Sequence, residues 1–242
     1  MIVISAGMMK SASTIVCDYE IEIMKLTSRR NGQFKLLNFS SSKVRAYRGK
    51  LDFKTCIILI LINYIYGDIV LKSHSGPTIF ARLLMIMGIA KVSYTYRDPR
   101  DAVLSMMDHG DRTRKELLNG GQSLEGKRGF RHIYKIEDAL PEIKNEINNC
   151  CKWKEIKGVL LIRYENFIEN RYDYINTIAS FLERNLEDKD ISSIYQKYEI
   201  NKPENLNKGT KNRYIHEMNE EEVALCNSYF LDELNELMYS LK

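Results

Sequence analysis

Cations and hydroxyl groups gather in three short stretches of the sequence, in combinations that bind anions such as phosphate groups. The first stretch, residues 7–14 (GMMKSAST), follows an apolar run at the N-terminus. A small-residue turn between a strand and a helix exposes backbone N–H groups at the positive end of the helix, which attracts anions. An ordinary turn capped by Ser and Thr is the alternative that this stretch leaves open. Its candidate ligands are Lys10, Ser11, Ala12, Ser13 and Thr14.

This first stretch does not match the common nucleoside-triphosphate loop. A Walker A loop reads GxxxxGK[ST], whereas Met9 precedes Lys10 and Gly7 lies too close to the lysine for a loop of that size. The residues therefore predict an anion site that differs from a standard P-loop.

The second stretch, residues 71–77 (LKSHSGP), places a histidine two residues after a lysine. A nearby cation lowers the pKa of a histidine and so favours the neutral imidazole that accepts a proton. Lys72 and His74 are therefore candidate catalytic groups. A capping or simply exposed histidine is the competing interpretation.

The third stretch, residues 96–105 (YRDPRDAVLS), combines an arginine with a serine on a helix. Pro99 is typical of a first helical turn, and Ser105 lies about two turns further along. Arg97 and Ser105 held in this way suit a second phosphate group. The alternative interpretation is a surface cluster of Arg–Asp ion pairs, which contribute little to the free energy of folding.

Each of these stretches follows a short apolar run, and helical patterns separate the runs. Strands are predicted at residues 1–5, 69–72, 92–96 and 159–162, and their alternation with helices indicates an α/β fold with a parallel sheet and a single domain. In such sheets, ligands bind beyond the carboxyl ends of the strands, where all three stretches lie. Helices are predicted at 14–27, 77–88, 99–109, 137–153, 172–183, 188–198 and 219–241.

The composition is that of a soluble globular protein. The 242 residues are 44% hydrophobic and 28% charged, which excludes disordered and collagen-like classes. A pI near 8.6 falls below the value of about 9 that indicates a nucleic-acid surface, so no nucleic-acid partner is expected. The most apolar run, residues 57–62, is too short to span a bilayer, and the N-terminus lacks the pattern of a signal peptide. Five scattered cysteines without CxxC spacing indicate reduced thiols, which predicts a cytoplasmic protein. Without a long apolar span or a convincing cluster of His, Cys and Asp ligands, neither a membrane partner nor a metal is predicted.

Taken in chain order, the three stretches resemble motifs of the sulfotransferases that use 3′-phosphoadenosine-5′-phosphosulfate (PAPS), especially the soluble small-molecule type. Residues 8–15 resemble YPKSGTTW, residues 72–76 resemble KTHLP, and residues 97–105 resemble RNPKDxxxS. Residues 164–166 (YEN) are similar to YEDL, and residues 207–209 (NKG) are similar to RKG. The resemblance runs in order from about residue 3 to residue 220.

The resemblance implies a P-loop-like central parallel sheet flanked by helices, and PAPS as a donor that leaves as 3′,5′-diphosphoadenosine (PAP). It implies that Lys10 and the hydroxyls around it hold the 5′-phosphosulfate, that His74 is the general base and that Lys72 steadies the sulfuryl oxygens. Arg97 and Ser105 would grip the 3′-phosphate. Tyr164 would approach the adenine, and Asn207, Lys208 and Gly209 would close over the 3′-phosphate.

The acceptor implied by the resemblance is a small molecule with a hydroxyl or amine. Residues 110–155 match no motif and are the expected acceptor-binding segment; within them, the glycine-rich stretch 110–132 is predicted as a surface loop with room for one helix, and as a candidate lid. The family resemblance allows a monomer or a homodimer.

Three positions depart from the family pattern. Ala12 replaces a glycine, which is tolerated if its φ is negative, and Ile15 replaces a tryptophan that stacks on adenine. Asn207 replaces an arginine, whose charge Lys211 or Arg213 is able to restore.

Two alternatives stay open at this point. A P-loop-related nucleotide kinase would use ATP and Mg²⁺, although the Walker A glycine before Lys10 is absent. A catalytically idle nucleotide-binding protein is the other, and such a protein would be expected to have lost His74.

Overall fold

The computed structural model describes residues 1–38, 45–119, 129–200 and 209–241, which form one α/β domain. Its five strands are all parallel, in the order β2-β3-β1-β4-β5. The four predicted strands are confirmed, and the fifth, β2, pairs over only two residues at the edge of the sheet. The strands are β1 (Ile2–Gly7), β2 (Tyr47–Arg48), β3 (Ile69–Ser73), β4 (Ala90–Tyr96) and β5 (Val159–Arg163).

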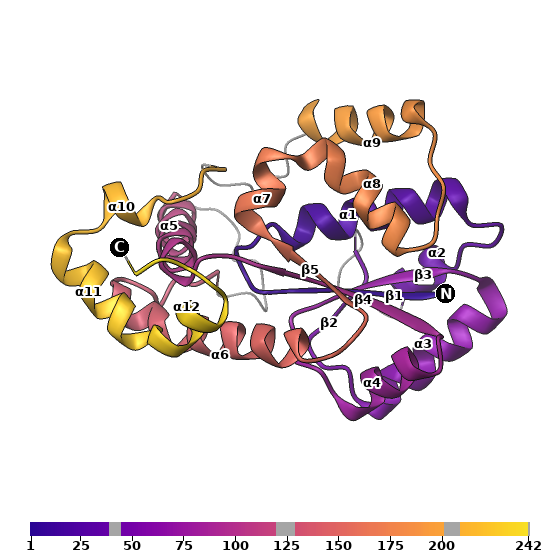
Figure 1. The fold of residues 1–242 in the computed structure, drawn as a ribbon, viewed down its shortest axis with the longest axis horizontal. Helices are drawn as coiled ribbons and strands as arrows, with labels where there is room; N and C mark the ends of the chain where they lie inside the picture. The colour runs from indigo at the N-terminus through magenta and orange to yellow at the C-terminus, as the bar shows by residue number, and fades with distance from the viewer. Residues whose placement is uncertain (39–44, 120–128, 201–208, 242) are drawn as a thin grey trace.

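Helices cover both faces of this sheet, so that the molecule has three layers (Figure 1). On one side lie α3, α4 and α6, and on the other lie α1, α8 and α9. The helices are α1 (Ser13–Thr27), α2 (Gln33–Asn38), α3 (Phe53–Tyr66), α4 (Ile79–Ile86), α5 (Pro99–Leu118), α6 (Ile136–Lys154), α7 (Tyr164–Glu169), α8 (Arg171–Phe181), α9 (Asp188–Ile200), α10 (Tyr214–Glu217), α11 (Glu220–Tyr229) and α12 (Leu231–Glu236).

The central strand β1 is buried along its whole length, which explains why its sequence is apolar except for Ser5. Successive side chains of a strand point to opposite faces of the sheet. Ile2 and Ile4 therefore pack in the core beneath α3, α4 and α6, while Val3 packs in the core beneath α1 and α8. Two separate apolar cores thus hold the carboxyl end of β1 at the middle of the sheet.

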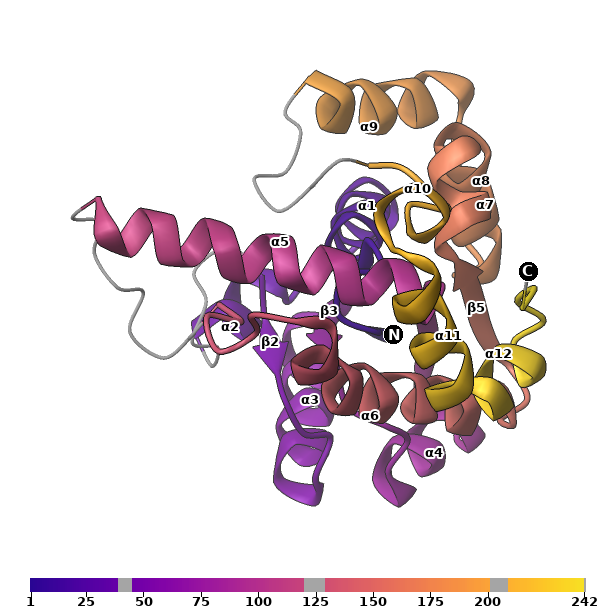
Figure 2. The same cartoon turned by 90° about the vertical axis from the view of Figure 1, so that its left-hand side faces the viewer.

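The order of the strands creates a crevice at the carboxyl end of β1. The chain leaves β1 towards β2 and β3 on one side, then crosses to β4 on the other side. Such a switch point is where open α/β sheets bind ligands. Figure 2 looks at this edge of the sheet, with α5 crossing in front and α10 and α11 beside it.

Part of the predicted loop at residues 110–132 is helical instead. Helix α5 continues through Gly110 to Leu118, whereas it was expected to end at His109. Gly110 is buried in the helix, and a Cβ at this position would lie 2.5 Å from the carbonyl oxygen of Phe130. Glycine inside a helix usually destabilises it, but here the missing side chain allows the returning chain to pack closely on the helix.

Four of the described helices, α2, α3, α7 and α10, are absent from the prediction. For α3, Asp52 caps the N-terminus and Gly67 ends the helix, and both residues are standard helix signals. The predicted last helix is divided into α11 and α12 at Phe230. Among the residues that the structure describes, no helix is long and apolar enough to cross a membrane.

Candidate functional site

The loop between β1 and α1 is a tight turn whose backbone is partly left-handed. Lys10 has φ 67° and Ala12 has φ 63°, so the condition for tolerating alanine in place of glycine at Ala12 is not met. An alanine in this region costs roughly 1–2 kcal/mol. The hydroxyl of Ser11 donates to the carbonyl of Met8 at 2.6 Å and lies 2.8 Å from Thr95 Oγ1. Ser11 therefore uses its side chain to hold the loop, which leaves its backbone N–H as the group to offer a ligand.

His74 follows β3 and lies directly against this loop. Its Nδ1 lies 2.5 Å from the carbonyl oxygen of Gly7. A carbonyl only accepts, so Nδ1 carries the proton and the lone pair belongs to Nε2. The ring also packs near that of Tyr47, with centroids 5.7 Å apart. The fold thus fixes the tautomer that a general base requires.

Lys72, two residues before His74, reaches across to α1. Its ammonium group donates a hydrogen bond to the hydroxyl of Thr14 in the first turn of that helix. Two of the predicted stretches are joined in this way at the carboxyl ends of β1 and β3.

Lys10 lies where several cations meet. Its Nζ is 2.9 Å from Nδ1 of His109, and burial together with the positive charges of Arg112 and Arg97 lowers the pKa of Lys10 to about 8. Asp108 opposes this shift only in part. Cations that repel one another in this way favour the binding of an anion, because the anion relieves the repulsion.

Arg97 is almost fully buried beside the loop, with an exposed fraction of 4%. Its guanidinium donates to Asp101 at 3.2 Å and to the carbonyl of Thr210 at 2.7 Å, and it stacks on the ring of Tyr164 at 4.1 Å. Within the described part of the chain, its Nε has no hydrogen-bond partner although it is buried. A buried guanidinium N–H normally has a partner, so the Nε of Arg97 is an unsatisfied donor next to the loop.

One face of α5 lines the site from Arg97 to Lys10. Asp101, Ser105 and His109 are spaced by four residues and therefore share a face of the helix, with Arg112 one turn further on. Asp101 binds Arg97 and His109 contacts Lys10, so the buried Ser105 lies between these two contacts. His109 is the last residue of the helix predicted at 99–109 and belongs to no motif, and Arg112 lies beyond the predicted end, so neither residue was predicted to be in the site.

The late segment approaches the same place through Gly209 and Thr210. Gly209 has φ 68°, and Thr210 accepts the hydrogen bond from Arg97. Asn207 and Lys208 lie outside the described residues. Arg213 is engaged by Asp108 at 2.7 Å and by Glu217, and Lys211 pairs with Glu169. Both cations that could replace the missing arginine thus already have carboxylate partners.

Glu146 on α6 is a site residue that the sequence did not reveal. Its Oε2 accepts a hydrogen bond of 3.0 Å from the backbone N–H of Met9, next to Lys10. Asn149, three residues further along α6, lies against Gly76. Trp153, seven residues after Glu146, donates a hydrogen bond of 3.0 Å to the carbonyl of Ser75. This face of α6 therefore connects the loop after β1 to the loop that carries His74.

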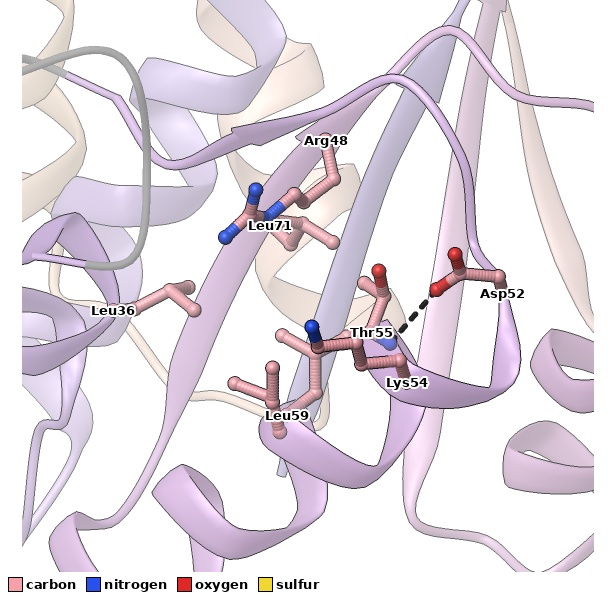
Figure 3. Close-up of a pocket in the computed structure, with 8 residues that line it drawn as sticks. Leu36, Arg48, Asp52, Lys54, Thr55, Leu59 and Leu71 are labelled. Atoms are coloured by element: carbon pink, nitrogen blue, oxygen red, sulfur yellow. Dashed lines mark hydrogen bonds between the residues drawn. The ribbon is translucent and has the colours of Figure 1, made fainter.

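The described residues hold no group of three or more His, Cys, Asp or Glu side chains arranged for a metal ion. A cavity of about 220 Å³ lies between β2 and the first turns of α3 (Figure 3). None of its lining residues is a predicted site residue. Arg48, Asp52 and Leu71 are among its lining residues, and Asp52 caps α3 there by accepting from the N–H of Thr55.

A family model described as a sulfotransferase domain matches residues 69–230 of this chain. That range contains the strand ends that carry Lys72, His74 and Arg97, as well as Ser105 and Tyr164. The chain belongs to the sulfotransferase family. It is therefore a transferase, and the resemblance seen in its motifs is confirmed.

Solved structures of sulfotransferases share the fold of this sulfotransferase. A mouse enzyme, SULT7A1 complexed with PAP, superposes with a TM-score of 0.64 at 14% identity, covering 96% of this chain and 83% of that chain. Retinol dehydratase in complex with retinol and PAP gives a TM-score of 0.54 at 16% identity, covering 97% of this chain and 81% of that chain. No curated protein matches this chain in sequence.

The buried carboxyl of Glu146 is expected to make the stability of this sulfotransferase depend on pH. Burial raises the pKa of Glu146 from 4.5 to about 7. A raised carboxyl pKa stabilises the fold below the unfolded pKa, and this contribution is lost as the pH rises from about 4.5 to 7. Glu146→Gln retains an acceptor for Met9 but does not titrate. Its free energy of unfolding relative to wild type should rise by about 3 kcal/mol between pH 4.5 and pH 8.

Urea unfolding at both pH values measures this difference. Glu142→Gln, one turn away on α6, is the matched control, because Glu142 is more exposed and pairs with His132. The buried Glu20, whose pKa is also raised to about 7, is present in every variant and cancels. Identical pH dependence in Glu146→Gln and wild type would contradict the prediction.

Proposed function

We propose that this sulfotransferase transfers the sulfuryl group of PAPS to a hydroxyl or amine of a small-molecule acceptor, with His74 as the general base. The observation that carries the proposal is the contact between His74 and the carbonyl of Gly7. It orients a histidine with a basic Nε2 beside a loop built for anions. No observation favours a nucleotide kinase or an idle nucleotide-binding protein.

The cations of the site fit the charge of the donor. Lys10 lies in the loop after β1 and contacts His109 on α5, and Lys72 reaches the first turn of α1 through its contact with Thr14. The backbone N–H groups at the start of α1 add the positive end of a helix. We propose that Lys10 neutralises the oxygen that bridges sulfur and the departing phosphate, and that Lys72 holds the sulfuryl oxygens. Ala12 and Ser13 would contribute backbone N–H groups.

The proposed reaction is an in-line displacement. The acceptor oxygen or nitrogen forms a bond to sulfur, the bond between sulfur and the 5′-phosphate oxygen breaks, and PAP leaves. The proton of the acceptor passes to Nε2 of His74. Its Nδ1–H remains hydrogen-bonded to Gly7, which stabilises the imidazolium that forms.

The second phosphate is assigned to Arg97 and Ser105. The buried Nε of Arg97 and its stacking on Tyr164 support this, because a planar guanidinium held in place binds phosphate through two parallel hydrogen bonds. Gly209 is adjacent to Thr210, whose carbonyl accepts a hydrogen bond from Arg97. This contact supports the proposal that residues 207–209 close over the 3′-phosphate. Tyr164 would then approach the adenine from below Arg97.

The acceptor site is assigned to the segment 110–155. Phe130 supports this assignment, since its ring lies 5.2 Å from that of His109 and 5.9 Å from Nζ of Lys10. Glu146 lies in the same segment and contacts the loop after β1. An apolar ring and a carboxyl beside the loop that carries Lys10 would accommodate a small organic acceptor.

Thermal denaturation with added nucleotides tests the donor. PAP at about 100 times its Kd should raise Tm by about 5–10 °C, since it binds only the folded protein. ATP with Mg²⁺ at the same concentration should raise it much less. Transfer of radiolabel from PAPS to a panel of phenols, alcohols and amines then identifies the acceptor class. A larger shift with ATP and Mg²⁺ than with PAP would overturn the proposal in favour of a kinase.

Binding of PAP should weaken as the pH rises above about 8. The pKa of Lys10 is about 8 without ligand, and a polyanion raises it, so binding takes up a proton above this pH. The dissociation constant should increase up to about tenfold per pH unit between pH 8 and 9.5. Titration calorimetry measures this slope. Lys10→Arg keeps its charge throughout and should show a flat profile; equal slopes for both proteins would refute the role of Lys10.

A further inference from the structure

The outer face of α3 carries large apolar side chains that are exposed to solvent. Phe53, Ile57, Leu61, Tyr64 and Ile65 are exposed by between 39% and 82%. Their spacing places them on one face of the helix, while Cys56, Leu59 and Ile62 on the opposite face are buried against the sheet. This helix is therefore apolar on both faces, although the fold covers only one of them.

Helix α4 continues the same exposed apolar layer. It lies beside α3 on the same side of the sheet (Figure 1), and the rings of Phe53 and Phe80 are 5.3 Å apart. Three of its apolar side chains, Ile79, Leu83 and Ile86, are exposed, and so is Met87, which directly follows the helix. We call these nine exposed residues the α3–α4 surface.

The α3–α4 surface is large enough for a stable protein interface. An exposed aromatic side chain carries roughly 150–250 Å² and an aliphatic one somewhat less, so at these exposures the nine present on the order of 900 Å². The largest apolar patch on a typical monomer measures about 300–600 Å². A standard interface buries about 800 Å² on each partner.

The charges around this surface favour a second copy of the same chain. Residues 57–66 and 83–90 contain no charged side chain, so the C-terminal halves of both helices are neutral. The cations Lys54 and Arg82 lie nearer the N-terminal ends of α3 and α4. A two-fold axis through the C-terminal halves brings neutral apolar surface onto itself and leaves these like charges at the rim, where they repel little.

We propose that the protein forms a two-fold symmetric homodimer through the α3–α4 surface. The interface would also stabilise the helices that flank the proposed catalytic residues Lys72 and His74. Helix α3 leads into β3 and so to Lys72 and His74, and α4 begins directly after Thr78, whose hydroxyl donates to the carbonyl of Leu51 before α3. This proposal does not depend on the identity of the donor or the acceptor.

Sedimentation equilibrium of the full chain, without detergent, tests the proposal. The wild-type protein should have twice the chain mass of 28.3 kDa at micromolar concentration. Ile86→Glu and Leu61→Glu place a charge in the neutral part of the surface and should weaken dimerisation at least 100-fold. Leu118→Glu, which changes a residue 86% exposed on α5, is the matched control and should remain dimeric.

A second measurement does not depend on how the charged variants fold. Ile86→Cys treated with a bismaleimide should form covalent dimers, whereas Leu118→Cys and wild type should not. A monomeric wild-type protein, or an Ile86→Glu variant that folds and stays dimeric, would overturn the proposal. Flotation of monomeric wild-type protein with anionic phospholipid vesicles would overturn it as well, and would assign the surface to a membrane.

Discussion

Replacing His74 with alanine should lower turnover at least 100-fold and leave the dissociation constant of PAP within about threefold of wild type. A general base typically contributes 10²- to 10⁴-fold to the rate. The side chain contacts the carbonyl of Gly7 rather than the N–H groups that face the proposed anion site, so its loss should spare nucleotide binding. Steady-state kinetics with PAPS and titration calorimetry with PAP provide the two measurements.

His216→Ala is the matched control for this variant. His216 is exposed on α10, outside the segments assigned to the donor and the acceptor, so its removal should leave turnover nearly unchanged. Turnover of His74→Ala within threefold of wild type would rule out His74 as the base. A parallel loss of PAP binding would instead mean that His74 mainly supports the loop.

Replacing Arg97 with alanine should weaken the binding of PAP about 100-fold, and the binding of adenosine 5′-phosphosulfate less than about threefold. A charge-assisted hydrogen bond contributes about 1.5–3 kcal/mol, and only PAP carries the 3′-phosphate that would receive it. The comparison of two ligands on one variant separates this local effect from any general disturbance of the site.

Arg97 also holds Asp101 and Thr210, so the variant requires a check of its fold. Arg97→Lys keeps the charge but loses the planar pair of donors, and we expect it to fall between wild type and Arg97→Ala. Calorimetry at one fixed ionic strength compares all three proteins. Equal losses for both ligands would remove Arg97 from the 3′-phosphate.

Much of the architecture follows from local sequence patterns. The runs that form β1, β3, β4 and β5 are rich in apolar and β-branched residues because helices cover both faces of the sheet, and such runs are visible without a structure. Strand β2 has only two residues and leaves no comparable pattern. Helix α3 has helix signals at Asp52 and Gly67, but the run between them is apolar on both faces and therefore lacks the periodicity of an amphipathic helix.

The predicted site could be located but not assembled from the sequence. Lys10, His74 and Arg97 each follow a strand, and parallel strands end at one edge, so their proximity was predictable. The contact of Lys10 with His109 and that of Met9 with Glu146 join residues 99 and 137 positions apart. No local pattern records such pairs, because they depend on how α5 and α6 pack across the edge of the sheet.

The sequence by itself therefore determined the class of fold, the family and the strand ends at which cations and a histidine occur. Only the tertiary structure decided which atom of His74 is basic, that the hydroxyl of Ser11 serves the loop, and that Ala12 adopts a left-handed conformation. The physical reason is that residue type and spacing encode burial and backbone preference over short distances. Tautomer, hydrogen-bond partner and local field are instead set by groups that folding brings in from elsewhere in the chain.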